Sequence, residues 1–527
     1  TNIGAEAFVQ CENLAGINVD ALNPFYSSSN GFLFDKHQTA LIEAPGTVAG
    51  NYIIPGSVTN IATGAFMDCA NLTGVVISNR VAIVGTNAFT GCTGLSNILI
   101  GTNVLGIAMS AFQGCSGLTD ATIPRSVVRL GAGVFNDCSS LTNVLIHSGV
   151  TNIESGLEGL ASFDLRILSL NAIQVAGDCP RLMAITVTGT SLYYSSTNGI
   201  LFNQPQTVLL EAPGGFAGGY TVPETVTNIA PGAFNACTNL TSLVIPNRVI
   251  SIGGGAFDAC GGLTNVVIGT NVTSIGQKAF SFCGALGTVA IPAGVTNIGD
   301  GALTGCRSLT NISVDPKNLY YSSFNGFLFD KHFTRLIQAP GGYAGNYTVP
   351  NSVTNIGDEA FENCSNLRDV TLGANISSIG NQAFFECNNL MSLFFKGNAP
   401  SAASMVFGGV ARRLPPIIGG QPLLLTPPVI YYLPGAQGWS ATFGGQPAVP
   451  WNLQVQTGGA GLGVRTNRFG FNITGSSDVE IVVEACTNLT KPNWLPVQTN
   501  VLTEGATYFS DAQWTNYPGR YYRFRSE

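Results

Sequence analysis

Apolar residues between positions 245 and 268 recur with two different spacings. The stretch Leu263-Thr-Asn-Val-Val-Ile268 ends in the alternation of apolar and outward positions that is typical of a short strand, and residues 249–252 form a second short extended piece. Between Ala256 and Leu263 the apolar positions are three and four residues apart, as in one or two helical turns. The unit therefore predicts two short strands and a short helix.

The same unit repeats every 23 residues, and cysteines mark the period. Cysteines at this spacing run from Cys69 to Cys138, from Cys237 to Cys306, and from Cys364 to Cys387. A fixed period of this length predicts a solenoid, in which each coil buries its apolar residues only by stacking on the next coil.

We count fourteen coils by the position equivalent to the cysteine. This count includes degenerate coils at Ala161, Cys179 and Val410. The step from Ala161 to Cys179 is 18 residues instead of 23. This shorter step predicts an irregular coil near residues 155–180.

Three gaps of 58 residues between cysteines equal one period plus the same 35-residue insertion. The insertions lie at about 20–55, 188–223 and 315–350. In the first one, Asn30-Gly31 is typical of a tight turn, and Gly-Phe-Leu-Phe can pair with Ala-Leu-Ile-Glu as a β-hairpin. Three copies at matching phase indicate a structural module that substitutes for the helix.

The periodicity divides the chain into three parts. Residues 1–396 are expected to form the solenoid, and the Pro- and Gly-rich residues 397–450 its C-terminal cap and a loop, because a terminal repeat needs an atypical outer face. From 451 to 527 five short alternating segments predict a small β-sandwich.

The consensus Ile-Pro-x-x-Val-x-x-Ile-Gly-x-x-Ala-Phe-x-x-Cys-x-x-Leu-x-x-Val-x-Ile, together with the Tyr-x-Ser-x-x-Gly-x-Leu-Phe hairpins, resembles the BspA-like leucine-rich repeat surface proteins over residues 1 to about 440. The resemblance implies secreted or surface-anchored bacterial proteins, some of which adhere to host or matrix proteins. It implies no particular ligand. The expected fold is an α/β leucine-rich-repeat solenoid with short strands, short helices and three β-hairpin insertions, followed by a small all-β sandwich domain.

The composition excludes several functions. Only 10% of the residues are charged, and 22 Lys and Arg spread thinly along the chain form no basic stripe for nucleic acid. The sequence contains no run of 18 apolar residues, so we expect no transmembrane segment. The chain has three histidines: His37 and His332 occupy equivalent turns of two different hairpins, and His147 stands alone. We expect that the protein is not an enzyme and that it has no cofactor or metal site.

Thirteen cysteines could form a disulfide framework in a secreted protein, but here they occur once per coil. Equivalent side chains in stacked coils point the same way, which disfavours bridging, and Cys-x2-Cys zinc ligands are absent. We therefore predict a ladder of buried, reduced thiols. Cys486 lies outside the ladder and has no evident partner.

One outward position could carry binding. The residue before the last Ile of the Leu-x-x-Val-x-Ile strand points away from the core, yet it is apolar in half the coils. This predicted stripe consists of Val76, Leu99, Leu145, Val244, Val267 and Phe394. It is a candidate contact surface, although simple β-propensity also favours valine there.

The sequence predicts a secreted or cell-surface, non-enzymatic recognition or adhesion protein that binds a protein or glycan through this face. The alternative is a structural protein that assembles head to tail into an extracellular filament or surface layer. That alternative rests on the first coil, which begins uncovered at Thr1 and would offer an open sheet edge.

Overall fold

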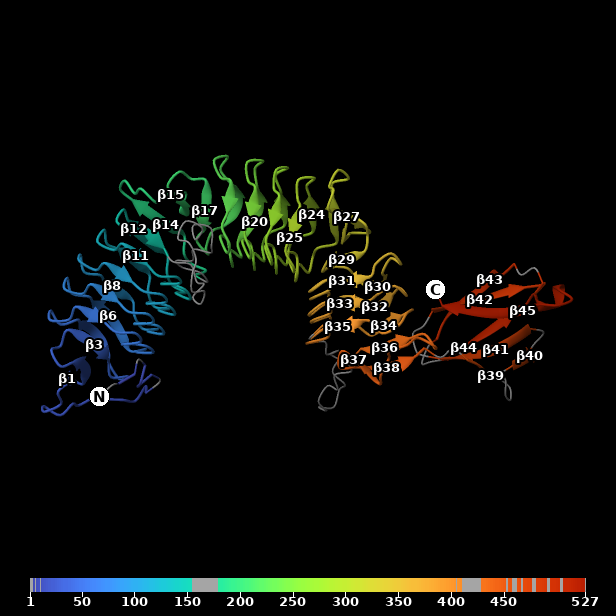
Figure 1. The fold of residues 1–527 in the computed structure, drawn as a ribbon, viewed down its shortest axis with the longest axis horizontal. Coiled ribbons are helices and arrows are strands. Elements are labelled where there is room, and N and C mark those ends of the chain that lie inside the picture. The colour runs from blue at the N-terminus through green and yellow to red at the C-terminus, as the bar shows by residue number, and fades with distance from the viewer. Residues whose placement is uncertain are drawn as a thin grey trace.

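The computed structural model describes residues 3–4, 6–9, 11–153, 179–403, 405–409, 428–451, 454–456, 462–465, 468–475, 480–490, 493–502 and 506–526. Within them the chain winds into stacked coils that together form an arc, and a smaller pair of sheets follows at the C-terminal end (Figure 1). The irregular coil expected near residues 155–180 lies almost entirely outside the described residues.

Each coil contributes one longer strand, and these strands pair in parallel with the strands of neighbouring coils, as Val76 does with Leu99. The Leu-x-x-Val-x-Ile prediction of a strand is confirmed. The longer strands are β4 (Gly50–Ile53), β6 (Leu72–Val76), β8 (Asn97–Leu99), β10 (Asp120–Ile123), β12 (Asn143–His147), β14 (Ala184–Thr188), β18 (Gly218–Thr221), β20 (Leu240–Val244), β22 (Asn265–Val267), β24 (Thr288–Ile291), β26 (Asn311–Val314), β30 (Gly345–Thr348), β32 (Leu367–Leu372), β34 (Ser392–Phe395), β36 (Val429–Tyr432) and β38 (Gln446–Pro450).

A second, two-residue strand in each regular coil pairs in parallel with those of its neighbours, and among the described residues these short strands belong to three successive sheets. The second residue of each strand except β35 (Ser401–Ala402) is an Ile, Val or Leu that points inward. Threonines just before several of these strands donate a side-chain hydrogen bond to a backbone carbonyl of the preceding coil, as Thr296 Oγ1 does to Thr273 O at 3.2 Å. The short strands are β5 (Asn60–Ile61), β7 (Ile83–Val84), β9 (Gly106–Ile107), β11 (Arg129–Leu130), β13 (Asn152–Ile153), β19 (Asn228–Ile229), β21 (Ser251–Ile252), β23 (Ser274–Ile275), β25 (Asn297–Ile298), β31 (Asn355–Ile356), β33 (Ser378–Ile379) and β35 (Ser401–Ala402).

The predicted short helix is wrong: the Ala-Phe-x-x-Cys segments are turns. Gly64 and Asp68 both have positive φ, 69° and 60°, and left-handed residues four apart interrupt a right-handed helix. The backbone also bonds outward, since Phe66 N donates to Ala88 O of the next coil at 2.7 Å. The described residues contain no α-helix, and a 3-10 helix at Trp514–Asn516 is their only helical element.

These turns line the core with ladders of phenylalanine and cysteine. Phe234, Phe257 and Phe280 stack with centroids 5.1 Å apart at each step. The thiol of Cys260 donates to Phe234 O at 3.0 Å, and burial raises its pKa to about 12. Cys11 is the exception among the thirteen cysteines, because its side chain is exposed.

Three hairpin modules interrupt the regular coils. Each has two antiparallel strands joined by an Asn-Gly turn and a third strand antiparallel to the second. The third strand also continues the short-strand sheet. The modules comprise β1 (Tyr26–Ser29), β2 (Phe32–Asp35) and β3 (Ala40–Glu43); β15 (Tyr194–Thr197), β16 (Ile200–Asn203) and β17 (Val208–Glu211); and β27 (Tyr321–Phe324), β28 (Phe327–Asp330) and β29 (Arg335–Gln338).

Each module covers the edge of the coil before it through the same three hydrogen bonds. In the third module, Tyr321 Oη accepts from Ile298 N at 2.9 Å, Ser323 Oγ accepts from Val314 N at 3.0 Å, and the carbonyl of Gly326 accepts from Ile312 N at 3.0 Å. The corresponding acceptors are Tyr26, Ser28 and Gly31 in the first module and Tyr194, Ser196 and Gly199 in the second. The modules thus join consecutive parts of the solenoid.

The modules also shape the arc. In the third module, Gln338-Ala-Pro-Gly stands in place of a full turn segment, so the coils on either side approach each other on that face. Glu359 lies so close to Gly301 that a Cβ on the glycine would be 2.1 Å from the carboxylate Oε2. Figure 1 shows that the arc turns most sharply between β27 and β29.

Ala161, where a degenerate coil is expected, lies outside the described residues. Strand β12 pairs directly with β14, with Leu145 opposite Thr186, and Cys179 donates to Phe135 O at 2.9 Å. The coil that ends at Cys179 therefore stacks on the coil of Cys138.

After β38, which also pairs with β37 (Thr442–Phe443), two antiparallel sheets follow. One contains β39 (Gln454–Gln456), β41 (Arg468–Thr474), β40 (Leu462–Arg465) and β44 (Ala506–Asp511); the other contains β43 (Leu495–Val501), β42 (Glu480–Cys486) and β45 (Tyr521–Ser526). Phe471, Ile481 and Phe509 belong to a buried core that also includes Phe394 and Trp451. The sheets and the last coils of the solenoid therefore share one apolar core.

Candidate functional site

The outward face of the longer strands aligns equivalent residues of successive coils into a column. Ile53 lies opposite Val76, and Val76 lies opposite Leu99. Farther along, Val244 lies opposite Val267. Parallel pairing in register places such residues one strand spacing apart, about 4.8 Å, so the side chains of each group form a continuous surface.

The predicted stripe is divided into patches. We define the first patch as Ile53, Val76 and Leu99, and the second patch as Val244 and Val267. Ile53 and Leu99 are 68% and 62% exposed, and both valines of the second patch are exposed. Leu145 is separate, because its neighbours in the column are Thr122 and Thr186.

Sequence reasoning missed Ile53 because it follows a hairpin insertion instead of a regular repeat. The signal was present: Ile53-Ile54-Pro55 has the same order as Val244-Ile245-Pro246. Ile54 is buried and Ile53 is exposed, as their alternation requires.

Phe394 does not belong to the exposed stripe, and its prediction is wrong. It is 7% exposed. Its ring stacks on Tyr431 of the next strand at 5.1 Å and contacts Trp451 at 5.3 Å. The outward face of the solenoid is covered at this point by the apolar core of the C-terminal sheets.

A polar column runs beside the apolar one, two residues earlier in each strand. Asn97 lies opposite Gly74, and Asn265 lies opposite Ser242. The two asparagines are exposed. Carboxamides can donate and accept hydrogen bonds, so the first and second patches each have a polar border without net charge.

The hairpin modules add a second set of exposed apolar side chains. Phe25, Tyr193 and Tyr320 occupy the same position in the three modules and are between 49% and 52% exposed. A highly exposed leucine lies within three residues of each: Leu22, Leu192 and Leu319. The backbone carbonyl of each aromatic residue accepts a hydrogen bond within its module, while the ring extends from it.

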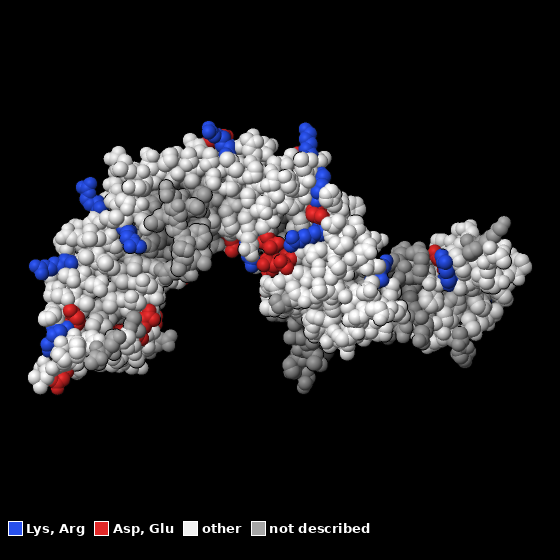
Figure 2. Space-filling view, viewed as in Figure 1, with Lys and Arg blue, Asp and Glu red and all other residues white. Residues whose placement is uncertain are grey.

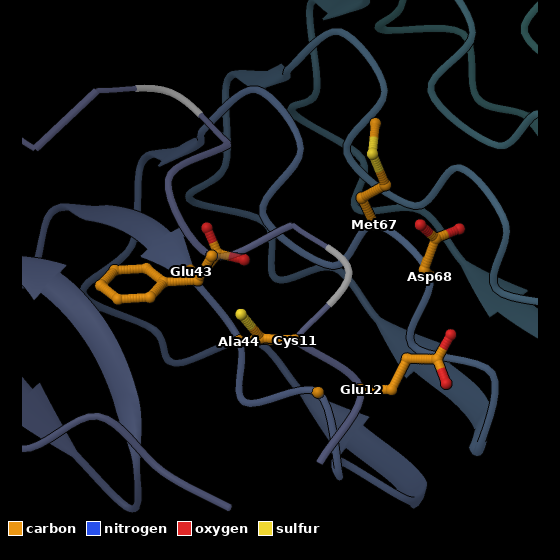
Figure 3. A pocket seen from close by; sticks show the side chains of 8 residues that line it. Cys11, Glu12, Glu43, Ala44, Met67 and Asp68 are labelled. Carbon is orange, nitrogen blue, oxygen red and sulfur yellow. The ribbon is translucent and has the colours of Figure 1, made fainter. Parts of the chain in front are cut away.

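A small cavity lies beside the first hairpin module. Figure 3 shows carboxylates from Glu12, Glu43 and Asp68 around it, together with Cys11 and Met67. Burial, with a smaller contribution from the charge of Glu6, raises the pKa of Glu43 to about 7. The cavity encloses about 10 Å³, roughly the space of one water molecule, and is too small for an organic substrate.

The histidines do not meet. His37 and His332 lie in turns of separate hairpin modules, and His147 Nδ1 lies 2.8 Å from Thr188 Oγ1 on the adjacent strand. Among the described residues, no group of three or more His, Cys, Asp or Glu side chains is arranged to hold a metal ion. The helices of the described chain include none that is long and apolar enough to cross a membrane.

Residues 49–157, 219–328 and 344–412, together more than half of the chain, match six copies of a family model described as a BspA type leucine rich repeat region. No curated protein matches the chain.

Solved structures similar to this chain include a leucine rich cell surface protein from Faecalibacterium prausnitzii, with 23% identity, 67% of this chain and 95% of that chain covered, and a TM-score of 0.40. The pneumococcal vaccine antigen PcpA has 15% identity, 78% and 94% coverage, and a TM-score of 0.42. A leucine-rich repeat protein from Eubacterium ventriosum has 18% identity, 76% and 96% coverage, and a TM-score of 0.39.

Proposed function

Because this chain belongs to the BspA-type leucine-rich repeat family, we propose that it is a non-enzymatic recognition or adhesion protein of the cell surface or extracellular space. Its partner is a protein or a glycan. The contact surface is the outward face of the longer strands. The observation that carries the proposal is the first patch, where three apolar side chains align in register on one exposed sheet face.

The physical basis is that the patch remains exposed on a rigid scaffold. Isolated exposed valines are explained by β-propensity alone. The first patch is different, because Ile53 and Leu99 are both more than 60% exposed and align with Val76. Together they form a contiguous apolar surface of the kind that marks interaction sites. Because parallel backbone pairing holds these strands, little conformational entropy is lost when a partner binds.

The hairpin modules supply further contacts in this proposal. Each exposed aromatic ring directly precedes a strand whose first residue, a tyrosine, accepts a hydrogen bond from the preceding coil. Repetition of the same aliphatic and aromatic pair at three places along the arc suits a partner with repeating units, since several weak contacts then act together.

We propose that these surfaces belong to a solenoid of residues 1–396, with residues 397–450 as its cap and 451–527 as a β-sandwich domain. In this arrangement the sandwich covers the last part of the outward face. The partner then binds the part of the outward face that the earlier coils form.

The first experiment is a binding screen of the purified protein against immobilised matrix proteins and polysaccharides. The variant Val76→Asp/Leu99→Asp should lose attachment to any partner found, because two carboxylates would have to be desolvated at the contact. Thr122→Asp is the matched control, since this exposed threonine occupies the same column outside both patches. Unchanged attachment by a correctly folded double variant would exclude the first patch as the site.

Head-to-tail self-assembly is the alternative function. It predicts fibres or sheets in electron micrographs and a concentration-dependent mass in solution. Monodisperse monomers across a wide concentration range would exclude it.

A further inference from the structure

Charged side chains gather at one corner of a molecule that carries few of them. The corner is the sharp turn of the arc at the third hairpin module, where Figure 2 shows acidic side chains together with basic ones on the inner side of the arc. We define the corner cluster as Lys278, Asp300, Arg335, Glu359 and Glu362. These residues come from coils before the module, from the module itself, and from the first coil after it.

One ion pair of this cluster spans the module, and a second joins the module to the coil before it. Lys278 Nζ lies 3.6 Å from Glu359 Oε1, although the two residues are separated by a hairpin insertion. Arg335 Nη2 on β29 lies 3.3 Å from Asp300 Oδ1 of the preceding coil. The cluster therefore connects the parts of the solenoid that lie on the two sides of the turn.

Glu359 and Glu362 are both more than nine-tenths buried, and the Oε2 atom of each has no hydrogen-bond partner. A buried carboxylate oxygen without a donor is costly. The two residues belong to the same turn, in which Glu362 N donates to Glu359 O at 3.0 Å, and the interaction with Glu359 raises the pKa of Glu362. A single proton between them would satisfy both oxygens.

The repeat itself does not require these carboxylates. In the coils that follow the other two modules, the position of Glu359 is occupied by Gly64 and Gly232, and that of Glu362 by Met67 and Asn235. The solenoid thus stacks onto a module without an acid at either of these two positions of the following coil. The pair is particular to the corner where the arc turns most sharply.

We propose that a proton shared between Glu359 and Glu362 holds this corner closed, and that its loss opens the turn between the two parts of the solenoid. When Glu362 is protonated, its hydroxyl donates to the Glu359 carboxylate, which remains paired with Lys278. When Glu362 ionises, two buried carboxylates face one another across a narrow space. Separation of the coils on this inner face lets water reach both.

The surrounding charges set the pH range in which Glu362 ionises. Burial, followed by the charge of Glu359, raises the pKa of Glu362 to about 7, and Glu386 of the next coil acts in the same direction. Lys278 opposes them. Asp300 is paired with Arg335, and Asp358 Oδ1 accepts from Asn381 N at 2.6 Å, so these two carboxylates are already held by partners.

Small-angle X-ray scattering of the full chain between pH 5 and pH 9 tests the proposal. The wild-type radius of gyration and maximum dimension should increase as pH rises, with a midpoint near the raised pKa of Glu362, about 7. Glu362→Gln should keep the compact low-pH dimensions throughout, because its amide donates to Glu359 and cannot ionise. Glu224→Gln, at an exposed position, is the matched control and should follow the wild type.

A second variant separates failure to fold from failure of the proposal. Glu362→Met introduces the side chain found at Met67 and removes the titrating group, so its dimensions should not change with pH. Hydrogen exchange, corrected for the intrinsic rise of amide exchange with pH, should also show lower protection of amides 299–303 and 357–363 at high pH in the wild type alone. A flat wild-type profile, or a transition that persists in both variants, would overturn the proposal.

Discussion

Replacement of Phe257 by alanine should destabilise the solenoid by about 3–5 kcal/mol. Phe257 is fully buried, and its ring stacks between Phe234 and Phe280 at 5.1 Å on either side. Truncation removes both ring contacts and leaves a cavity between coils. The coils cannot close over the cavity, because backbone hydrogen bonds such as Phe257 N to Ala279 O, 2.8 Å, fix their separation.

Phe257→Leu is the matched control and should lose only about 1–1.5 kcal/mol. Leu303 already occupies the equivalent position of a later coil and is buried there, so the layer accepts leucine. Urea unfolding followed by far-ultraviolet circular dichroism reports on the coils. The four tryptophans, 439, 451, 494 and 514, all lie in the C-terminal part, and their fluorescence reports on that part separately.

The alanine variant should lower the dichroism midpoint while the fluorescence transition moves less, because each coil contacts only its neighbours. A loss below about 1 kcal/mol for alanine, well under the usual cost of a buried phenylalanine, would refute the argument. So would equal losses for alanine and leucine, since the cavity would then not determine the cost.

Three further predictions follow from the core, the modules and the buried acids. The native protein should alkylate quickly at Cys11 alone, and denaturation should release the other thiols; an intact mass showing disulfides across the ladder would contradict the stacked geometry. Tyr321→Phe should cost about 1–3 kcal/mol in urea unfolding because it leaves Ile298 N without its acceptor, whereas the same change at exposed Tyr320 should cost under 0.5 kcal/mol or so. Burial raises the pKa of Glu43 from 4.5 to about 7 in the folded state, so the stability that its protonated form contributes should be lost as pH rises from about 4.5 to 7. The melting temperature should therefore fall across this range, and Glu43→Gln should reduce that fall.

The helix prediction failed for a reason visible in particular residues. Ala256, Phe257 and Cys260 have helical spacing in the sequence, but Gly255 and Ala259 adopt positive φ of 58° and 57°. An alanine in the left-handed region has no local reason to be there. The adjoining coil supplies the reason, since Ala259 N donates to Ser281 O at 2.9 Å.

The candidate site was predictable in part. Val244 and Val267 are exposed and in register because a strict 23-residue period places equivalent residues side by side. Ile53 was missed because the insertion before it interrupts the 23-residue period. Phe394 has the same place in its strand, and only the docking of the C-terminal sheets explains why it is buried.

The sequence by itself determined the repeat, the inward and outward sides of both strands, and the phase of the three insertions, because period and alternation are local properties that stacking preserves. The tertiary structure decided the turn conformation, the direct pairing of β12 with β14, the burial of Phe394 and the corner where Glu359 approaches Lys278. The turn conformation depends on hydrogen bonds to the adjoining coil, whereas the other three depend on contacts between segments whose separation in the chain is not one period. Distances of that kind are set by how the coils and sheets pack, which the spacing of residues along the chain does not encode.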